Sequence, residues 1–229
     1  MSAVNHEAIG ILGGTFNPIH LGHLRLAQEV ADTLALGEIR FIPGGTPPHR
    51  ATPQTPVADR VAMVKCAIEG NPLFVLDERE VRRSGKSYTF DTLRELRAEL
   101  GATRPLVLIM GADAFLGFES WHRWQEIFAL AHIAVAHRPG SVLVSGEMPT
   151  ALAREFTQRR GHDRHAAHHA VNHTAAGVIV EVPITALDIS ATQVRELIRL
   201  RRSARYLLPT AVLDYINDKK LFLKENLIS

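Results

Sequence analysis

Cysteine is almost absent from this sequence, in which Cys66 is the only one among 229 residues. A single thiol excludes an internal disulfide and a metal site built from clustered cysteines. Long apolar runs are missing too, since no stretch approaches the roughly 20 residues that a helix needs to cross a membrane. An excess of charge is also lacking, because 26 Lys and Arg residues face 24 Asp and Glu residues. The composition therefore favours neither a membrane nor nucleic acid as a partner.

The chain begins without the basic and then apolar pattern of a secretion signal, so we expect a cytoplasmic protein. Its 229 residues, 46% of them hydrophobic, suffice for one large α/β domain with a sizeable core. Cys66 lies within the apolar stretch 61–68, where we expect a packed small side chain rather than a nucleophile.

Short apolar runs alternate with amphipathic stretches along most of the chain. Residues 9–12 and 39–43 indicate buried strands, and the apolar positions between them recur at helical spacing, with Gly37 as the expected C-cap. Further strands are expected at residues 73–77, 105–110, 133–137 and 178–182. Strands that alternate with helices are typical of a parallel sheet with right-handed crossovers.

The stretch 13–23, Gly-Gly-Thr-Phe-Asn-Pro-Ile-His-Leu-Gly-His, joins the first strand to the first helix. Its glycines allow backbone to approach a ligand closely, and Pro18 bends the chain. His20 and His23 fall at the start of the helix, where free N–H groups and the positive end of the helix dipole favour anions. Either feature alone would equally suit a tight turn with packed histidines. Together they indicate a turn that binds a polyphosphate.

Polar residues follow several of the later strands. Residues 44–50 form a Gly- and Pro-rich loop ending in His49 and Arg50, and Asp113 comes directly after the most continuous apolar run. Because open α/β sheets bind ligands at the carboxyl ends of their strands, we expect these residues on one edge. A solvated loop and a helix-capping aspartate are the alternatives.

Three hydroxyl residues are placed to cap helices: Thr89, Ser190 and Thr210. Residues 79–86 are mostly charged, which favours a solvated turn. Residues 162–173 carry five histidines, yet no cysteine or paired carboxylate completes a tetrahedral metal site. We therefore expect a mobile, partly ordered surface insertion at 141–174 and no bound metal.

The chain resembles the nucleotidyltransferases with a His-x-Gly-His motif, and most closely their bacterial nicotinate-nucleotide adenylyltransferase branch. The resemblance rests on the 13–23 stretch, Pro-Pro-His-Arg at 47–50, Ser-Tyr-Thr-x-Asp-Thr-Leu at 87–93 and Ile-Ser-x-Thr-x-x-Arg at 189–195. Gly-x-Asp at 111–113, a tryptophan at 121 and Arg-Pro-Gly at 138–140 follow the family order as well. Asn17 matches one of the two residues that the branch carries there, and His122 replaces a tyrosine of some relatives.

The resemblance implies a Rossmann-like doubly wound domain over residues 1–185 and a small helical part at 186–229. It implies ATP contacts from Gly13, Gly14, Thr15, Phe16, His20, His23, Arg50, Gly111, Asp113, Arg138, Ile189, Ser190, Thr192 and Arg195. It implies substrate contacts from Thr15, Asn17, His49, Arg50, Tyr88, Thr89, Asp113 and Trp121, with the Trp121 ring stacked on the pyridine. His20 and His23 are the catalytic candidates.

The implied reaction joins ATP and nicotinate mononucleotide to give deamido-NAD and pyrophosphate. The phosphate of the substrate is itself the nucleophile, which agrees with the lack of a convincing catalytic triad or reactive cysteine. Mg²⁺ is expected to be held mainly by the phosphates, since the sequence shows no carboxylate cage. Two alternatives remain: an adenylyltransferase acting on phosphopantetheine, and a catalytically idle nucleotide-binding regulator. The sequence does not indicate the oligomeric state.

Overall fold

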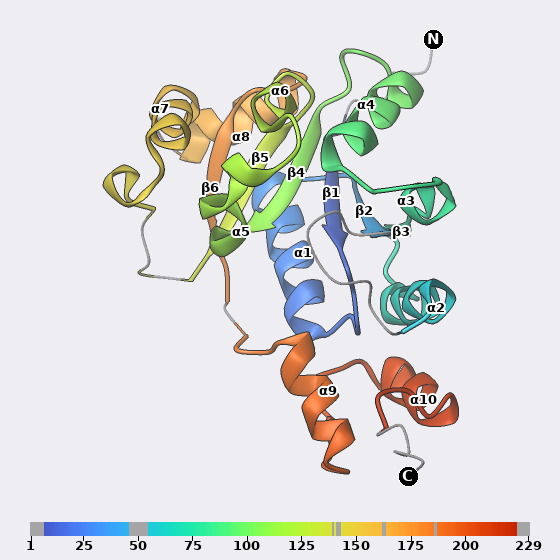
Figure 1. The fold of residues 1–229 in the computed structure, drawn as a ribbon. Coiled ribbons are helices and arrows are strands. Elements are labelled where there is room, and N and C mark those ends of the chain that lie inside the picture. Colours follow the sequence, from blue (N-terminus) through green and yellow to red (C-terminus); the bar gives the residue numbers. More distant parts are fainter. Residues whose placement is uncertain are drawn as a thin grey trace.

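The protein is built around a single parallel sheet, seen in a computed structural model that describes residues 7–45, 55–138, 140, 143–161, 164–185 and 187–223. Six strands pair in the order β3-β2-β1-β4-β5-β6, and every neighbouring pair is parallel. The strands are β1 Ile9–Gly14, β2 Glu38–Pro43, β3 Phe74–Leu76, β4 Leu106–Gly111, β5 His132–His137 and β6 Ile179–Pro183. This is the strand order of a doubly wound Rossmann sheet, and the predicted fold class is confirmed (Figure 1).

Helices cover the sheet on both faces (Figure 1). They are α1 Leu21–Leu34, α2 Val57–Ile68, α3 Arg79–Arg82, α4 Thr89–Leu100, α5 Ala112–Leu116, α6 Trp124–Ile127, α7 Thr150–Arg159, α8 Arg164–His173, α9 Ala191–Arg199 and α10 Thr210–Asp218. Single 3₁₀ turns lie at Phe118–Ser120 and Ser145–Glu147.

Alternation along the strands divides the core between two faces. In β4, Val107 and Ile109 belong to a cluster with buried residues of α1, α2, α8, α9 and α10. Leu106, Leu108 and Met110 belong to a second cluster with α4, α5, α6 and α7. Because successive side chains of a strand point to opposite faces, a central strand covered on both sides must be apolar throughout. This accounts for the continuous apolar run that marks β4 in the sequence.

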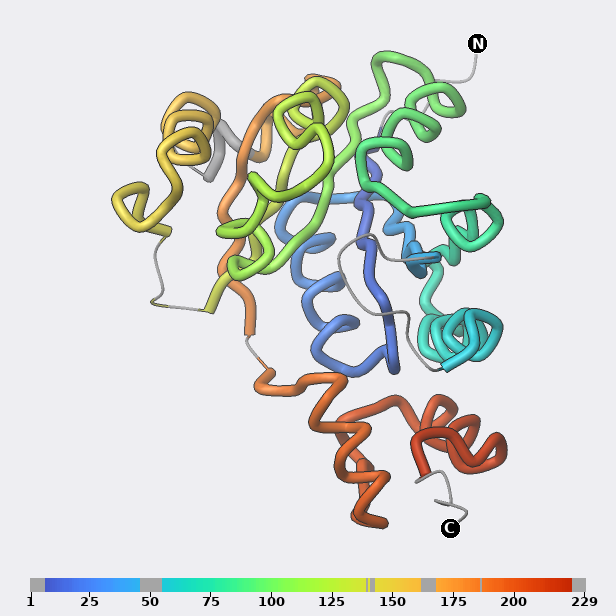
Figure 2. Tube along the Cα trace, in the orientation of Figure 1, coloured from blue at the N-terminus to red at the C-terminus, as the bar shows by residue number. Residues whose placement is uncertain are grey.

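The C-terminal helices lie beyond the carboxyl edge of the sheet, past the end of β1 (Figure 2). Val194 and Ile198 of α9 and Val212 and Ile216 of α10 are nevertheless buried in the first of the two clusters. The hydroxyl of Tyr215 also donates to Asp59 of α2 at 2.8 Å. The C-terminal part therefore shares a core with the sheet domain, next to the edge where ligands are expected.

Three of the predicted caps are wrong. Helix α1 ends before Gly37, and Ala35 is its C-cap in the left-handed region at φ 49°. Thr89 and Thr210 are the first residues of α4 and α10, whose N-caps are Tyr88 and Pro209 without a side-chain cap. Ser190 is confirmed, because its hydroxyl accepts from the N–H of Gln193 at 3.1 Å. Capping needs extended backbone at the cap residue, and the sequence does not show which residue adopts it.

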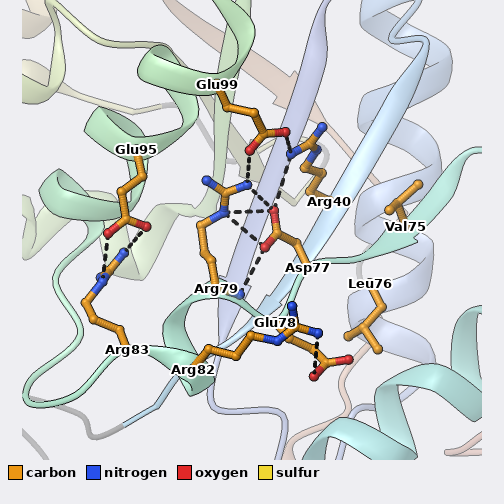
Figure 3. Close-up of a pocket in the computed structure, with 10 residues that line it drawn as sticks. All are labelled: Arg40, Val75, Leu76, Asp77, Glu78, Arg79, Arg82, Arg83, Glu95 and Glu99. Carbon is orange, nitrogen blue, oxygen red and sulfur yellow. Dashed lines mark hydrogen bonds and ion pairs between the residues drawn. The ribbon is translucent and has the colours of Figure 1, made fainter.

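Residues 79–86 are not a simple solvated turn. Arg79 starts helix α3 and pairs with Asp77 at 2.7 Å and with Glu99 of α4 at 2.7 Å. Arg40 of β2 reaches the same two carboxylates, at 3.4 and 2.9 Å (Figure 3). The charges of this segment line a hollow in which they neutralise one another, and they fasten α3 and α4 to the edge of the sheet.

The region 141–174 contains α7 and α8, and α8 is a packed helix rather than a mobile surface segment. Val171 is fully buried, and the side-chain amide of Asn172 donates to the carbonyl of Leu34 in α1 at 3.0 Å. Helix α8 thus belongs to the crossover between β5 and β6. That this region varies among relatives stays a prediction. Cys66 packs, half-buried, against the first core cluster, as expected.

Over the described residues, no helix combines the length and the apolar character needed to span a bilayer.

Candidate active site

The turn between β1 and α1 has an unusual backbone. The Asn17–Pro18 peptide bond is cis, and Phe16 has a φ of 46° with its ring buried at 2% exposure. The Phe16 ring packs against Phe41 of β2 and, edge to face, against His23. The buried Phe16 ring thus anchors the turn to the core, whereas Gly13, at the start of the turn, is exposed.

His20, which is buried, and His23, which is partly buried, form a pair at the first turn of α1. Their ring centroids are 3.7 Å apart, and the backbone N–H of His20, the N-cap, donates to Nδ1 of His23 at 3.2 Å. A Cβ on Gly22 would lie 3.0 Å from Nδ1 of His20, so glycine leaves room for that ring. Burial lowers the pKa of His20 to about 4, and burial together with His20 lowers the pKa of His23 to about 3. Both rings are therefore neutral at pH 7 in the ligand-free protein.

Helix α9 brings the second motif onto this turn. Arg195 donates to the carbonyl of Asn17 at 2.8 Å and to the hydroxyl of Thr192 at 3.2 Å. The carbonyl of Ile189 lies 3.8 Å from the position of a Cβ on Gly22. Segments about 170 residues apart in the chain thus meet at the start of α1, as the motif resemblance implied.

Two buried polar atoms of the turn have no hydrogen-bond partner among the described residues: Oδ1 of Asn17 and Nδ1 of His20. Buried polar groups are nearly always paired, so two such atoms at a strand end are candidates for contact with a ligand. The first N–H of α1 is not available to that ligand, because Leu21 donates to the carbonyl of Leu207 at 3.0 Å. The expectation of entirely free first-turn N–H groups is wrong at this position.

The ends of β4 and β5 extend the same edge. Gly111 is the N-cap of α5 and pairs in register with Ala136, and Asp113 in the first turn of α5 is exposed. Arg138 faces Asp188, which precedes α9, at 3.6 Å. Both side chains are exposed, at 70% and 99%, so this ion pair adds little stability and leaves Arg138 available to a ligand.

The residues expected around a pyridine ring form a second group. The Tyr88 ring packs against the His122 ring at 4.5 Å, and Trp121 packs its edge on Phe118 at 5.3 Å. Trp121 remains half-buried. Thr89 begins α4. The structure thus brings the Tyr88 and Trp121 segments together, with His122 between them.

Arg60 of α2 joins the two groups, and our sequence analysis missed it. Its guanidinium donates to the carbonyl of Thr15 at 2.8 Å and to that of Gly45 at 3.4 Å. A Cβ on Gly45 would lie 2.9 Å from the hydroxyl of Ser87, next to Tyr88. The sequence carries a signal for Arg60: it shares the buried stripe of α2 with Met63 and Val64 at helical spacing. A charged residue in such a stripe needs a polar partner inside the protein.

His49 and Arg50 lie outside the described residues. In the part of the chain that is described, no group of three or more His, Cys, Asp or Glu side chains is arranged to hold a metal ion.

The parallel sheet, the histidine turn and the arginine of α9 are the features of a nucleotidyltransferase, and the cytidylyltransferase-like family matches residues 11–197. A probable nicotinate-nucleotide adenylyltransferase of Dechloromonas aromatica is 50% identical over 94% of this chain and 98% of its own. One of Halorhodospira halophila is 49% identical over 90% and 91%. The chain belongs to the cytidylyltransferase-like family and, within it, to the nicotinate-nucleotide adenylyltransferases.

A solved structure supports the fold. The nicotinic acid mononucleotide adenylyltransferase of Plasmodium falciparum complexed with NaAD has a TM-score of 0.69 with 16% identity and covers 95% of this chain and 98% of its own. At such low identity the likeness concerns the fold alone.

Proposed function

We propose that the carboxyl edge of the sheet is where this nicotinate-nucleotide adenylyltransferase aligns ATP with nicotinate mononucleotide. The observation that supports it most is a pair of buried atoms, Asn17 Oδ1 and His20 Nδ1, that no described residue bonds, beside two arginines that hold the turn. ATP is a co-substrate of this reaction. Because the enzyme consumes ATP, we expect it to act in the cytoplasm.

In the proposed arrangement the triphosphate lies against the turn of β1 and the start of α9. Gly13, Gly14, Thr15 and Phe16 supply backbone, and His20, His23, Thr192 and Arg195 supply side chains. Ser190 is occupied as a cap, so it contributes through the start of α9 rather than through a free hydroxyl. Arg138, Gly111, Asp113 and Ile189 border the nucleotide farther along the edge. Arg50 is carried over from the resemblance alone.

Nicotinate mononucleotide is proposed to lie over the end of β2, between Tyr88, Thr89 and Trp121. Asn17 and Thr15 face both substrates, and His49 and Arg50 are assigned to its phosphate by resemblance. The α-phosphorus of ATP is then attacked by that phosphate, a pyrophosphate leaves, and no covalent enzyme intermediate forms. Catalysis consists of alignment and of stabilising the charge that moves to the leaving group.

The histidines begin this reaction neutral, because burial holds the pKa of His20 at about 4 and that of His23 at about 3. Neutral imidazoles can donate one N–H each to phosphate oxygens, and a bound polyanion raises the pKa of both rings. The described residues offer no carboxylate cage, so Mg²⁺ is proposed to arrive with ATP and to be held by its phosphates.

The test is pyrophosphate release by the purified protein with ATP and, in turn, nicotinate mononucleotide, nicotinamide mononucleotide and phosphopantetheine. We expect release with nicotinate mononucleotide to be the fastest. Faster release with phosphopantetheine would overturn the substrate assignment, and ATP binding without release from any acceptor would indicate a nucleotide-binding regulator.

A further inference from the structure

Arg60 is the largest fully buried side chain of the described protein, with 1% of its surface exposed. It reaches from α2 to two carbonyls, those of Thr15 after β1 and Gly45 after β2, at 2.8 and 3.4 Å. Its Nε is buried and has no partner among the described residues. One guanidinium therefore ties together the loops that follow two neighbouring strands.

No carboxylate pairs with Arg60 within the described ranges. The adjacent Asp59 is bonded to the hydroxyl of Tyr215 instead. Burial lowers the pKa of Arg60, yet an arginine normally titrates so far above pH 7 that the group stays charged. A buried cation without an anion raises the energy of the ligand-free protein, and an anion bound at the turn lowers it again.

The contact with Thr15 also sets the direction of the next peptide group. The Thr15–Phe16 bond is trans, since the only cis bond among the described residues is Asn17–Pro18. In a trans peptide the C=O and N–H groups point in opposite directions. Arg60 draws the Thr15 carbonyl toward α2, so the N–H of Phe16 faces away from α2. The buried Phe16 ring holds the other side of that peptide in place.

We propose that Arg60 is a positioning residue for the phosphates. It orients the Thr15–Phe16 peptide so that the Phe16 N–H donates to a bound phosphate group, and its buried charge strengthens the binding of that group. Through the carbonyl of Gly45 it also sets the distance between this turn and the end of β2. The inference rests on the proposed function and assigns to the site a residue that never needs to touch a substrate.

Arg97 of α4 provides a matched control. It too is an arginine that donates to backbone carbonyls, those of Leu130, Gly101, Arg104 and Ala175. Burial lowers its pKa as it does for Arg60. Its partners precede β4, β5 and β6, at the opposite edge of the sheet. An arginine that only joins loops should behave like Arg97.

The experiment compares Arg60→Met, Arg60→Lys and Arg97→Met in the full chain. We measure Tm with and without Mg·ATP, and kcat and KM for ATP and for nicotinate mononucleotide. In Arg60→Met we expect kcat/KM to fall about 10- to 100-fold and the Tm rise on adding Mg·ATP to shrink. Arg60→Lys keeps the charge but holds one carbonyl, so it should recover part of the loss. Arg97→Met should lower Tm yet leave both KM values within about twofold.

The two KM values identify the phosphate: a rise for ATP assigns the triphosphate, and a rise for nicotinate mononucleotide assigns the monophosphate. If Arg60→Met folds and shows the KM values and the ATP-dependent Tm rise of the wild type, the inference about Arg60 is wrong. The proposed function would not be affected by that result. If Arg60→Met does not fold, the same values in Arg60→Lys would overturn it. A wild-type protein without pyrophosphate release would instead contradict the proposed function.

Discussion

The amino and carboxyl edges of the sheet both carry histidines and arginines, but these residues have different roles at the two edges. At the amino edge His132 is fully buried, and both ring nitrogens are bonded: Nε2 to the carbonyl of Thr174 at 2.8 Å and Nδ1 to the N–H of Val178 at 3.1 Å. At the carboxyl edge Nδ1 of His20 is buried and has no hydrogen-bond partner among the residues that the structure describes. A buried group with all its bonds made stabilises the fold, whereas one left unpaired costs stability unless a ligand completes it.

The arginines repeat the comparison. Arg97 donates to four carbonyls at the amino edge. Arg60 donates to two at the carboxyl edge, and its Nε has no partner within the described part of the chain. The difference teaches that burial and residue type do not distinguish a structural group from a functional one.

The sharpest contrast is expected between His23→Ala and His132→Ala. His23→Ala should fold and lose about 10²- to 10³-fold in turnover, the usual effect of removing one preorganised contact to developing charge. His132→Ala should instead lose about 2 to 4 kcal/mol of unfolding free energy and keep its turnover within about twofold. Steady-state pyrophosphate release and urea unfolding measure the two effects. Near-normal turnover in His23→Ala would break the comparison.

The next largest effect concerns the pyridine. A nicotinate carboxylate can accept from backbone N–H groups at the start of α4 and near Trp121, while a carboxamide places a donor against them. Each mismatch costs about 1 to 3 kcal/mol, so two predict discrimination of about a hundredfold against nicotinamide mononucleotide. Trp121→Ala should weaken use of the acid chiefly through KM. Equal kcat/KM for acid and amide would show a pocket not built around a carboxylate.

Much of this contrast could be predicted from the sequence. The alternating apolar runs predict a parallel sheet of strands joined by helices, and the family resemblance implies its doubly wound form. The turn at 13–23 and the Ser190 helix are marked by motifs that keep their spacing. Contacts that distant segments make through backbone atoms could not be predicted from the sequence. Arg60 binds carbonyls, which every residue carries, so no partner type in the sequence points to Thr15 or Gly45. Local backbone choices were hidden too, since Ala35 rather than Gly37 takes the left-handed cap.

The free energy of unfolding should depend on pH through histidines at both edges of the sheet. This effect is expected to be smaller than the two above. Burial lowers the pKa of His20 to about 4, that of His23 to about 3, and that of His132 below its usual value. The folded protein therefore binds fewer protons than the unfolded chain, whose histidines titrate near pH 6.5. Stability is present above that pH and is lost as pH falls from about 6.5 toward 4. For His20 and His23 we expect on the order of 1 to 2 kcal/mol each between pH 7 and pH 5, and His132 adds a loss in the same direction.

Urea unfolding as a function of pH measures this loss. The double variant His20→Asn/His23→Asn should show a flatter profile, and saturating Mg·ATP should offset the loss in the wild type. A profile that is flat in the wild type would contradict neutral burial of these rings.

The smallest effect is expected away from both edges. Changing His165, His168 and His169 of α8 together to alanine should leave turnover within about twofold, because α8 belongs to the crossover between β5 and β6 and not to the proposed site. Metal analysis of the purified protein checks the same variant. A stoichiometric metal that disappears in the variant along with activity would overturn the expectation.

The most direct test of the contrast between the edges is an NMR titration of the histidine rings, with ¹⁵N-labelled histidine and saturating Mg·ATP. Without ATP, His20, His23 and His132 should all be neutral at pH 7. With ATP, the ring nitrogens of His20 and His23 should shift and their pKa values should rise, while those of His132 stay unchanged. Rings of His20 and His23 that do not respond to bound ATP would contradict the account.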